Sequence, residues 1–222
     1  MKKILVVAVH PDDETLGAGG TLLKHKENGD EIFWLICTEI NKKLGYSKEK
    51  IISRKKEIDE VTLLFEIDKV AHLGLPTTQI DQFSMSELTK KISEVINEFQ
   101  PNIIYLPFKS DVHSDHRIIF DAVYSCTKSF RYPFIKRILM METLSETEFS
   151  PSTKEDCFIP NVYVDISKFI EKKIEIMKVY EGEIFEHPFP RSERNIKALG
   201  TFRGAAAGCD YAESFMLLKE IL

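Results

Sequence analysis

A short apolar run that ends abruptly in charged residues most constrains what this chain can fold into. Residues Ile4–Val9 are all apolar, and His-Pro-Asp-Asp-Glu follows directly at positions 10–14, the first polar loop. An apolar run of this length is typical of a buried strand. Buried charge is costly unless it is paired or bound to a metal, so ordinary core packing does not account for the residues that follow. The pattern predicts a strand whose end carries chemistry.

The same arrangement recurs near the middle of the chain. A second apolar stretch at 102–107 is followed by the second polar loop, Asp-Val-His-Ser-Asp-His at 111–116, and then by a helical pattern. In a parallel sheet such strand-to-helix junctions fall on one edge, where ligands of open α/β sheets bind. We therefore expect the two polar loops to converge although about a hundred residues separate them.

Strand patterns and helical patterns alternate along much of the chain. Thr15 is expected to cap the first helix. Further strands are predicted at 31–37, 70–73, 137–141 and 161–165, and helices at 15–28, 48–65, 84–99, 167–180 and 192–207. The alternation predicts a Rossmann-like α/β fold, with a mostly parallel sheet and helices on both faces. The length is suited to one core, so a single domain is expected over residues 1–222.

Composition excludes several classes of partner. Hydrophobic residues make up 43% and charged residues 29% of the chain, as in ordinary globular proteins. The net charge of -5 gives no electrostatic case for binding nucleic acid. No segment approaches the roughly 18 consecutive apolar residues of a membrane span, and the N-terminal apolar run is too short for a signal peptide. A cytoplasmic location without a membrane span is expected.

The cysteines and three of the histidines are expected to have ordinary packing roles. The four cysteines are scattered, with no Cys-x-x-Cys pair, which fits neither a disulfide framework nor a thiolate zinc site. His25, His72 and His187 have no acidic neighbourhood comparable to that of the two polar loops. Of these three, His187 has the strongest case for another role because it lies in a predicted loop.

The residue types in the two polar loops are those of a catalytic zinc site. Such sites use three protein ligands, drawn from His and carboxylates, and leave the fourth position to water. His10, one of Asp12 or Asp13, and one of His113 or His116 supply such a set. Zinc lowers the pKa of a bound water to about 7, and the remaining carboxylate and histidine can move a proton and stabilise an oxyanion. This inventory suits hydrolysis of an amide or an ester.

The alternative is that the acids cap helices and the histidines are exposed loop residues. Acids are favoured in the first turn of a helix by its dipole. Either polar loop alone would be open to this interpretation, but two such loops at predicted strand ends favour a site.

The chain resembles the PIG-L (LmbE-like) zinc-dependent N-acetylsugar deacetylases. The resemblance is carried by residues 10–14 with the glycine-rich helix start after them, and by His-Ser-Asp-His at 113–116. More loosely, residues 54–57 resemble the Arg-x-x-Glu helix of that family, and residues 203–204 and 212–215 resemble its C-terminal region. The paired motifs are specific at this spacing, whereas either one alone would not be.

The resemblance implies a role for each polar side chain. The implied zinc ligands are His10, Asp13 and His116. Asp12 would be the general base and later the proton donor to the leaving amine, while His113, protonated and oriented by Asp115, would stabilise the oxyanion. Glu14 would be a supporting residue. Another divalent metal such as Fe²⁺ can also occupy a mixed donor set of this kind.

One position departs from the pattern of some family members. These members carry a tyrosine that assists carbonyl polarisation two positions before the histidine that corresponds to His113, and this chain has Asp111 there. An ionised aspartate cannot take that role, so oxyanion stabilisation would rest on zinc and His113.

The arginines are the predicted substrate contacts. Arg54 matches a position that the family uses for its substrate, and Arg191, Arg194 and Arg203 could bind a phosphate or carboxylate bidentately. The alternative for each is a salt bridge with a neighbouring acid such as Glu57 or Glu193.

The implied reaction releases acetate from an N-acetylated amino sugar, either an N-acetylglucosamine-type glycoconjugate or a nucleotide sugar. The partner would be this small-molecule sugar, and a homo-oligomer is implied because such assemblies are common in the family. A metal-dependent amidase or esterase on a non-sugar substrate, and a non-catalytic sugar-binding module, are the alternatives.

Overall fold

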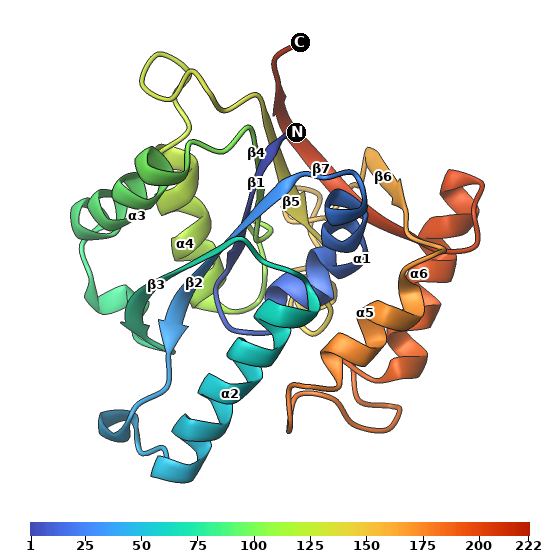
Figure 1. The fold of residues 1–222 in the computed structure, drawn as a ribbon, viewed down its shortest axis with the longest axis horizontal. Helices are drawn as coiled ribbons and strands as arrows, with labels where there is room; N and C mark the ends of the chain where they lie inside the picture. Colours follow the sequence, from blue (N-terminus) through green and yellow to red (C-terminus); the bar gives the residue numbers. More distant parts are fainter.

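The protein is built on a seven-stranded sheet with helices on both faces (Figure 1), and the computed structural model describes residues 1–222. The strand order is β3-β2-β1-β4-β5-β7-β6. Strands β1 to β5 are parallel, and β7 runs antiparallel to β5 and β6. The strands are β1 Lys3–Ala8, β2 Glu31–Glu39, β3 Lys69–Pro76, β4 Ile103–Leu106, β5 Arg137–Met141, β6 Val162–Asp165 and β7 Ala212–Glu220. The predicted α/β fold with a mostly parallel sheet is confirmed.

Six α-helices cover the sheet (Figure 1), and three short 3-10 segments lie in loops. The helices are α1 Asp13–Glu27, α2 Lys48–Leu64, α3 Met85–Phe99, α4 Ser114–Ser125, α5 Ile170–Met177 and α6 Glu193–Ala207, and the 3-10 segments are η1 Lys42–Leu44, η2 Ile80–Gln82 and η3 Thr147–Phe149. Helix α5 is shorter than the predicted 167–180. None of the helices is both long and apolar enough to cross a membrane.

Strand β1 is buried on both faces and divides the apolar interior into two cores. Leu5, Val7 and Val9 pack with side chains of α3 and α4 in one core. Ile4, Val6 and Ala8 alternate with them and pack with α1, α5 and α6 in the other. Side chains of a strand point alternately to opposite faces, so a strand covered on both sides reads as a continuous apolar run. This is the physical origin of the sequence feature at residues 4–9.

The first helix begins earlier than the sequence predicts. Asp12, not Thr15, occupies the N-cap of α1, and its carbonyl accepts hydrogen bonds from the backbone N–H groups of Thr15 and Leu16. The prediction of Thr15 as the cap is wrong. Because the helix starts at Asp13, Asp13 and Glu14 lie in its first turn, where the helix dipole favours negative charge.

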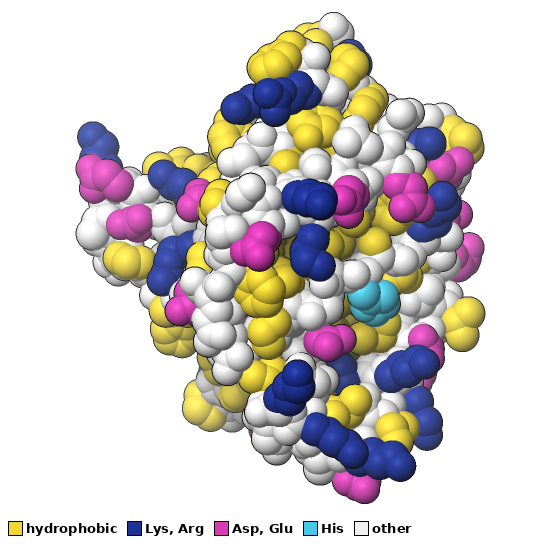
Figure 2. Space-filling model, turned by 90° about the vertical axis from the view of Figure 1, so that its left-hand side faces the viewer, with side chains coloured by type: hydrophobic (Ala, Val, Ile, Leu, Met, Phe, Trp, Pro, Cys, Tyr) yellow, Lys and Arg dark blue, Asp and Glu magenta, His cyan; other side chains and the backbone are white.

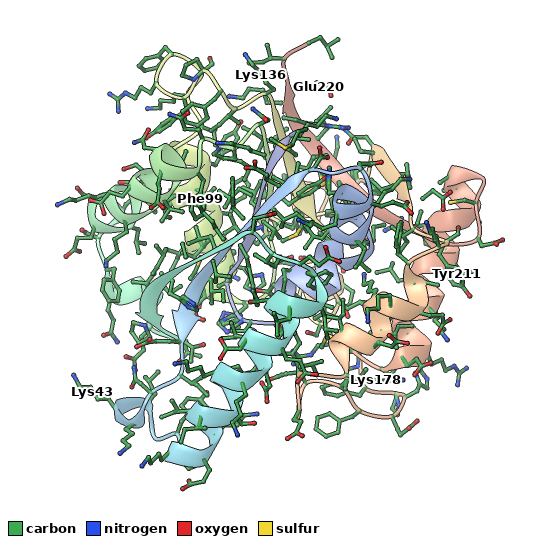
Figure 3. All side chains as sticks on the ribbon, in the orientation of Figure 1. Lys43, Phe99, Lys136, Lys178, Tyr211 and Glu220 are labelled. Atoms are coloured by element: carbon green, nitrogen blue, oxygen red, sulfur yellow. The ribbon has the colours of Figure 1, made fainter.

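The two polar loops leave the sheet side by side. Strands β1 and β4 are parallel neighbours, with Ile4 opposite Ile103 and Val6 opposite Tyr105. The first polar loop follows β1 and the second follows β4, so both lie at the carboxyl edge of the sheet. Lys136 and Glu220, labelled in Figure 3, mark the opposite edge. The predicted convergence of the two loops is confirmed.

Candidate active site

The structure brings His10, Asp13 and His116 together from the two polar loops. Nε2 of His116 lies 3.3 Å from Oδ2 of Asp13 and 3.3 Å from Nδ1 of His10, and Nδ1 of His10 lies 3.8 Å from the same Asp13 oxygen. Zinc binds nitrogen and oxygen at about 2.0–2.2 Å, which places neighbouring ligand atoms of a tetrahedron roughly 3.3–3.6 Å apart. The donor set therefore fits a single metal ion, with only small movements of the rings.

Two buried carboxylates hold the outer nitrogens of these histidines. Nδ1 of His116 donates to Oδ2 of Asp111 at 2.9 Å, and Nε2 of His10 lies 3.4 Å from Oδ2 of Asp115. An ionised carboxylate can only accept, so these contacts place the ring protons on the outer nitrogens. The inner nitrogens then offer lone pairs, as expected for metal-ligating histidines held by a carboxylate.

This contact gives Asp111 a role that the sequence did not reveal. Its side chain is fully buried, accepts from His116 and accepts at the other oxygen from the hydroxyl of Thr147 at 2.7 Å. Burial raises the pKa of Asp111, and the hydrogen bond from His116 opposes that shift. Asp111 therefore anchors His116.

Burial alone would lower the pKa of His116, but Asp13 and Asp111 outweigh it and hold that pKa well above its ordinary value. Burial likewise disfavours ionisation of Asp13, yet the charge of His116 and then of His10 keeps the pKa of Asp13 below its usual range. In the absence of a metal, these charges favour a protonated His116 beside an ionised Asp13. A cation that binds here replaces that proton.

His113 lies at the N-cap of α4, and its orientation differs from the expectation. The carboxylate of Asp115 is 3.9 Å from Nδ1 of His113 and instead accepts from the backbone N–H of Thr78 at 2.7 Å. The backbone N–H of Asp115 donates to Nδ1 of His113 at 3.1 Å. Asp115 thus orients His113 through its backbone, which leaves the proton of the neutral ring on Nε2.

The protonated state predicted for His113 has no support in its surroundings. Burial, and after it the charge of His10, lower the pKa of His113. A neutral ring still presents Nε2–H as a hydrogen-bond donor. Donation to a developing oxyanion therefore does not need a full positive charge on this ring.

Asp12 and Asp13 are adjacent in sequence, but their carboxylates face different partners. Asp13 accepts from the backbone N–H of His10 at 2.8 Å and faces the histidine pair. Asp12 accepts from Nη1 of Arg191 at 2.5 Å. It belongs neither to the donor set of His10, Asp13 and His116 nor to a second cluster of possible ligand atoms, formed by His10, His113 and Asp115. Burial, and then the charge of Asp13, raise the pKa of Asp12 well above its ordinary value, while Arg191 opposes them.

The backbone at Asp12 is in an uncommon conformation, with φ at 137°. Positive φ is rare outside glycine, and aspartate is one of the residues enriched there. Such a conformation costs free energy and persists only where the surroundings hold it. Here the N–H of Asp12 donates to Oε2 of Glu14 at 3.1 Å, which ties the turn to a buried side chain.

Glu14 lies behind the turn, as a supporting residue would. Oε1 of Glu14 accepts from the Tyr180 hydroxyl at 2.7 Å and from the Thr15 hydroxyl at 2.5 Å. Burial raises the pKa of Glu14 to about 7, and these donated hydrogen bonds oppose the shift. Glu14 is not among the side chains whose ligand atoms cluster closely enough to hold a metal.

Arg54 lies at the site, but its donors are already engaged. Nη1 donates to the carbonyl of Pro11 at 3.0 Å, Nη2 donates to Glu183 at 2.5 Å, and Nε lies 3.2 Å from Glu57. The salt bridge to Glu57 is the alternative that the sequence left open. Arg54 supports the backbone of the first polar loop in this conformation.

The other predicted arginines and His187 separate in space. Arg191 lines the cavity described below, whereas Arg194 is exposed and Arg203 pairs with Glu142 at 2.5 Å. His187 is exposed and does not line the cavity. Of these four residues, only Arg191 is brought to the site.

A cavity of about 500 Å³ opens above the two polar loops, a size typical of small-molecule sites. Its wall is made by the loop after β2, by α2, by the end of β3 and by the segment that carries Arg191. Lys and Arg side chains gather at the lower end of the face in Figure 2, where Figure 1 has η1 and the start of α2; Lys43, labelled in Figure 3, points outward there. The cavity includes His10, Asp12, Asp13, Thr38, Tyr46, Lys50, Arg54, His72, Thr77, His113, Glu146, Glu183 and Arg191.

Glu146 is a site residue that the sequence analysis missed. It accepts from the backbone N–H of His113 at 3.3 Å, and burial raises its pKa to about 7 although the charge of His116 opposes this. The residue follows β5, another parallel strand that ends at the same edge. The only signal in the sequence was its position after a strand, and the acids of this segment, Glu142, Glu146 and Glu148, have no histidine beside them.

The carboxyl edge of the parallel sheet carries two histidines and an aspartate at metal-ligand spacing. A second buried carboxylate lies next to them in an open cavity. Together these features define a metal-dependent hydrolase. The chain belongs to the PIG-L family, described as GlcNAc-PI de-N-acetylase, which matches residues 5–127.

Known proteins resemble the chain over nearly its whole length. Diacetylchitobiose deacetylase of Thermococcus kodakarensis is 23% identical over 230 residues, which cover 100% of this chain and 85% of that protein. The structure of N,N'-diacetylchitobiose deacetylase from Pyrococcus horikoshii has a TM-score of 0.78 at 22% identity and covers 98% of this chain and 84% of its own. A 4-carboxy-2-hydroxymuconate hydratase from Pseudomonas putida has a TM-score of 0.77 at 15% identity and covers 100% of this chain and 98% of its own. The fold alone therefore does not fix the reaction.

Proposed function

We propose that this protein is a zinc-dependent hydrolase that removes the N-acetyl group from an N-acetylglucosamine-type glycoconjugate or nucleotide sugar and releases acetate. The observation that carries the proposal is the tetrahedral spacing of His10, Asp13 and His116 beside the separate carboxylate of Asp12. The family and the deacetylase relative support an N-acetyl sugar as the substrate. Water and the amide are consumed, and acetate and the free amine are formed.

Each neighbouring side chain has a task in this reaction. Zinc held by His10, Asp13 and His116 would supply Lewis acidity to water and to the amide carbonyl. Asp12 takes a proton from the attacking water and later delivers it to the leaving nitrogen. His113 donates Nε2–H to the carbonyl oxygen as negative charge develops there.

The test is acetate release from a panel of acetylated sugars, measured with and without a chelator. We expect chelation to abolish release and added zinc to restore it. Asp12→Asn should abolish turnover while the metal stays bound, because Asp12 is outside the donor set. The matched control is Asp121→Asn, which changes an exposed acid on α4 and should leave turnover intact. Full activity of Asp12→Asn would refute the base role.

The same panel separates the alternatives. Acetylated amides and esters without a sugar test the amidase or esterase activity. A sugar-binding module would bind these sugars, measured by calorimetry, without releasing acetate in any metal form.

Zinc is proposed because the three donor atoms are spaced about as far apart as neighbouring ligands of a tetrahedral zinc ion. Two histidines and a carboxylate also bind Fe²⁺, so metal analysis of the purified protein decides between the two ions. Assembly into a homo-oligomer and a cytoplasmic location stay predictions.

A further inference from the structure

Two arginines and one glutamate enclose the turn that carries Asp12. We call Arg54, Arg191 and Glu183 the arginine clasp. Arg54 donates to the carbonyl of Pro11 at 3.0 Å, and Arg191 donates to Oδ2 of Asp12 at 2.5 Å. Glu183 joins the two, because one of its oxygens accepts from Arg54 at 2.5 Å and the other lies 3.1 Å from Nη1 of Arg191. The clasp therefore holds both the backbone before Asp12 and its side chain.

The surroundings of Arg191 distinguish this contact from a surface ion pair. The side chain is only 22% exposed, and its guanidinium lies over the Phe189 ring at 5.6 Å. Its partner Asp12 is 5% exposed in the side chain. Surface pairs contribute little because water screens them and the side chains stay mobile. A guanidinium packed against a ring and bound to two carboxylates is instead fixed in place.

One donor of Arg191 has no partner. Its Nε–H is buried and makes no hydrogen bond, although the side chain lines the cavity. A buried unpaired donor costs stability. Both ion pairs of Arg191 are made by Nη1, so the contacts with Asp12 and Glu183, and not Nε–H, set the position of the guanidinium.

We propose that Arg191 is a positioning residue for the general base: its Nη1 fixes Oδ2 of Asp12, so that Oδ1, which has no partner within the protein, is presented to the water. This inference rests on the proposed function, in which Asp12 moves the proton. Glu183 acts one step further out, by aligning Arg191. Small misplacements of a catalytic group cost large factors in rate, and the uncommon backbone of Asp12 makes misplacement easy once the contact is lost.

The test compares kinetic constants of Arg191→Gln with those of the wild-type metal-loaded enzyme on its best acetylated sugar. We expect kcat to fall by roughly 10- to 100-fold with little change in KM, because the contact acts on proton transfer and not on substrate binding. Metal content should stay at the wild-type level, since Arg191 touches no residue of the donor set. Free guanidinium at millimolar concentration should restore part of kcat in Arg191→Ala. Arg191→Lys should be intermediate, because it keeps the positive charge but not the planar guanidinium.

The matched control is Arg194→Gln, which changes an exposed arginine outside the cavity and should behave as the wild type with or without added guanidinium. Glu183→Gln keeps Arg191 but weakens its alignment, and we expect a smaller loss of kcat. In the double variant Arg191→Gln with Glu183→Gln, the loss should be less than the product of the two single losses, since both act through one contact.

The outcomes separate this inference from the proposed function. If the wild type releases no acetate from any sugar, the proposed function fails. If the wild type is active and Arg191→Gln keeps its kcat, the positioning role is refuted. A loss of kcat that comes with loss of metal, or that guanidinium does not relieve in Arg191→Ala when thermal unfolding is unchanged, also refutes it.

Discussion

Asp111 should control how tightly the protein holds its metal. The perturbation is Asp111→Ala, which removes the carboxylate that accepts Nδ1–H of His116 at 2.9 Å and the Thr147 hydroxyl at 2.7 Å. His116 then loses both its fixed orientation and the negative charge that strengthens its inner nitrogen as a ligand. We expect weaker metal binding, although Asp111 never touches the metal.

The magnitude follows from the type of contact. Loss of an outer carboxylate costs about 10- to 100-fold in metal affinity, which corresponds to about 1.4–2.8 kcal/mol of binding free energy. Asp111 also raises the pKa of His116, so its removal weakens the competing proton and offsets part of this cost at neutral pH. Asp111→Asn keeps an acceptor for the imidazole and loses only the charge, and its affinity should lie between those of the wild type and Asp111→Ala.

The assay is competition for zinc against a chromophoric chelator, with thermal unfolding of the chelated and zinc-loaded forms alongside it. Asp121→Ala is the matched control, because Asp121 is an exposed acid on α4, the helix that carries His116. An unchanged zinc affinity in Asp111→Ala, with the fold intact by circular dichroism, would refute the reasoning. Equal weakening in Asp121→Ala would also refute it, because the effect would then be one of general charge.

Two further predictions concern stability. Tyr180→Phe removes a hydrogen-bond donor to buried Glu14, so the free energy of unfolding should fall by about 1–3 kcal/mol. Urea unfolding measures this change, and Tyr163→Phe, which alters a half-exposed ring on β6, is the control. An unchanged unfolding midpoint in Tyr180→Phe would contradict a stabilising buried contact. The pKa of His116 is higher in the folded protein than in the unfolded chain, where it is about 6.5. Protonation of His116 therefore stabilises the chelated protein fully at pH values below about 6.5, and this stabilisation is lost as pH rises through the folded pKa. The melting temperature in chelator should therefore fall with rising pH above about 6.5 more steeply in the wild type than in His116→Gln, and parallel curves would exclude His116 as the cause.

The convergence of the two polar loops could be predicted because it follows from local patterns. Apolar runs specify buried strands, and parallel strands end at one edge, so residues 10–14 and 111–116 had to meet if both runs were parallel neighbours. The pairing of β1 with β4 satisfies this condition. The N-cap of the first helix was missed by three positions, because Asp12 caps α1 from a backbone conformation that a propensity argument does not consider.

The remaining contacts depend on directions that a sequence does not encode. Adjacent carboxylates at Asp12 and Asp13 are chemically alike, and only the turn decides which of them faces the histidine pair. Arg191 and Glu183 reach the site from a segment without regular structure. Arg191 is about 180 residues from Asp12 in the sequence. The role of Asp111 also depends on its surroundings. Its residue type suggested only that a tyrosine was missing, whereas the structure shows that it accepts a hydrogen bond from His116.

The backbone at Asp12 also limits which residues evolution can try there. Glycine adopts positive φ freely, and asparagine and aspartate do so more readily than most other residues; of these three only aspartate can carry a proton. A glutamate, although a chemically adequate base, is disfavoured by the turn itself. Relatives that keep this turn but have lost hydrolysis would therefore be expected to show asparagine or glycine at this position, and so to retain the metal-binding fold while losing the reaction in a single replacement.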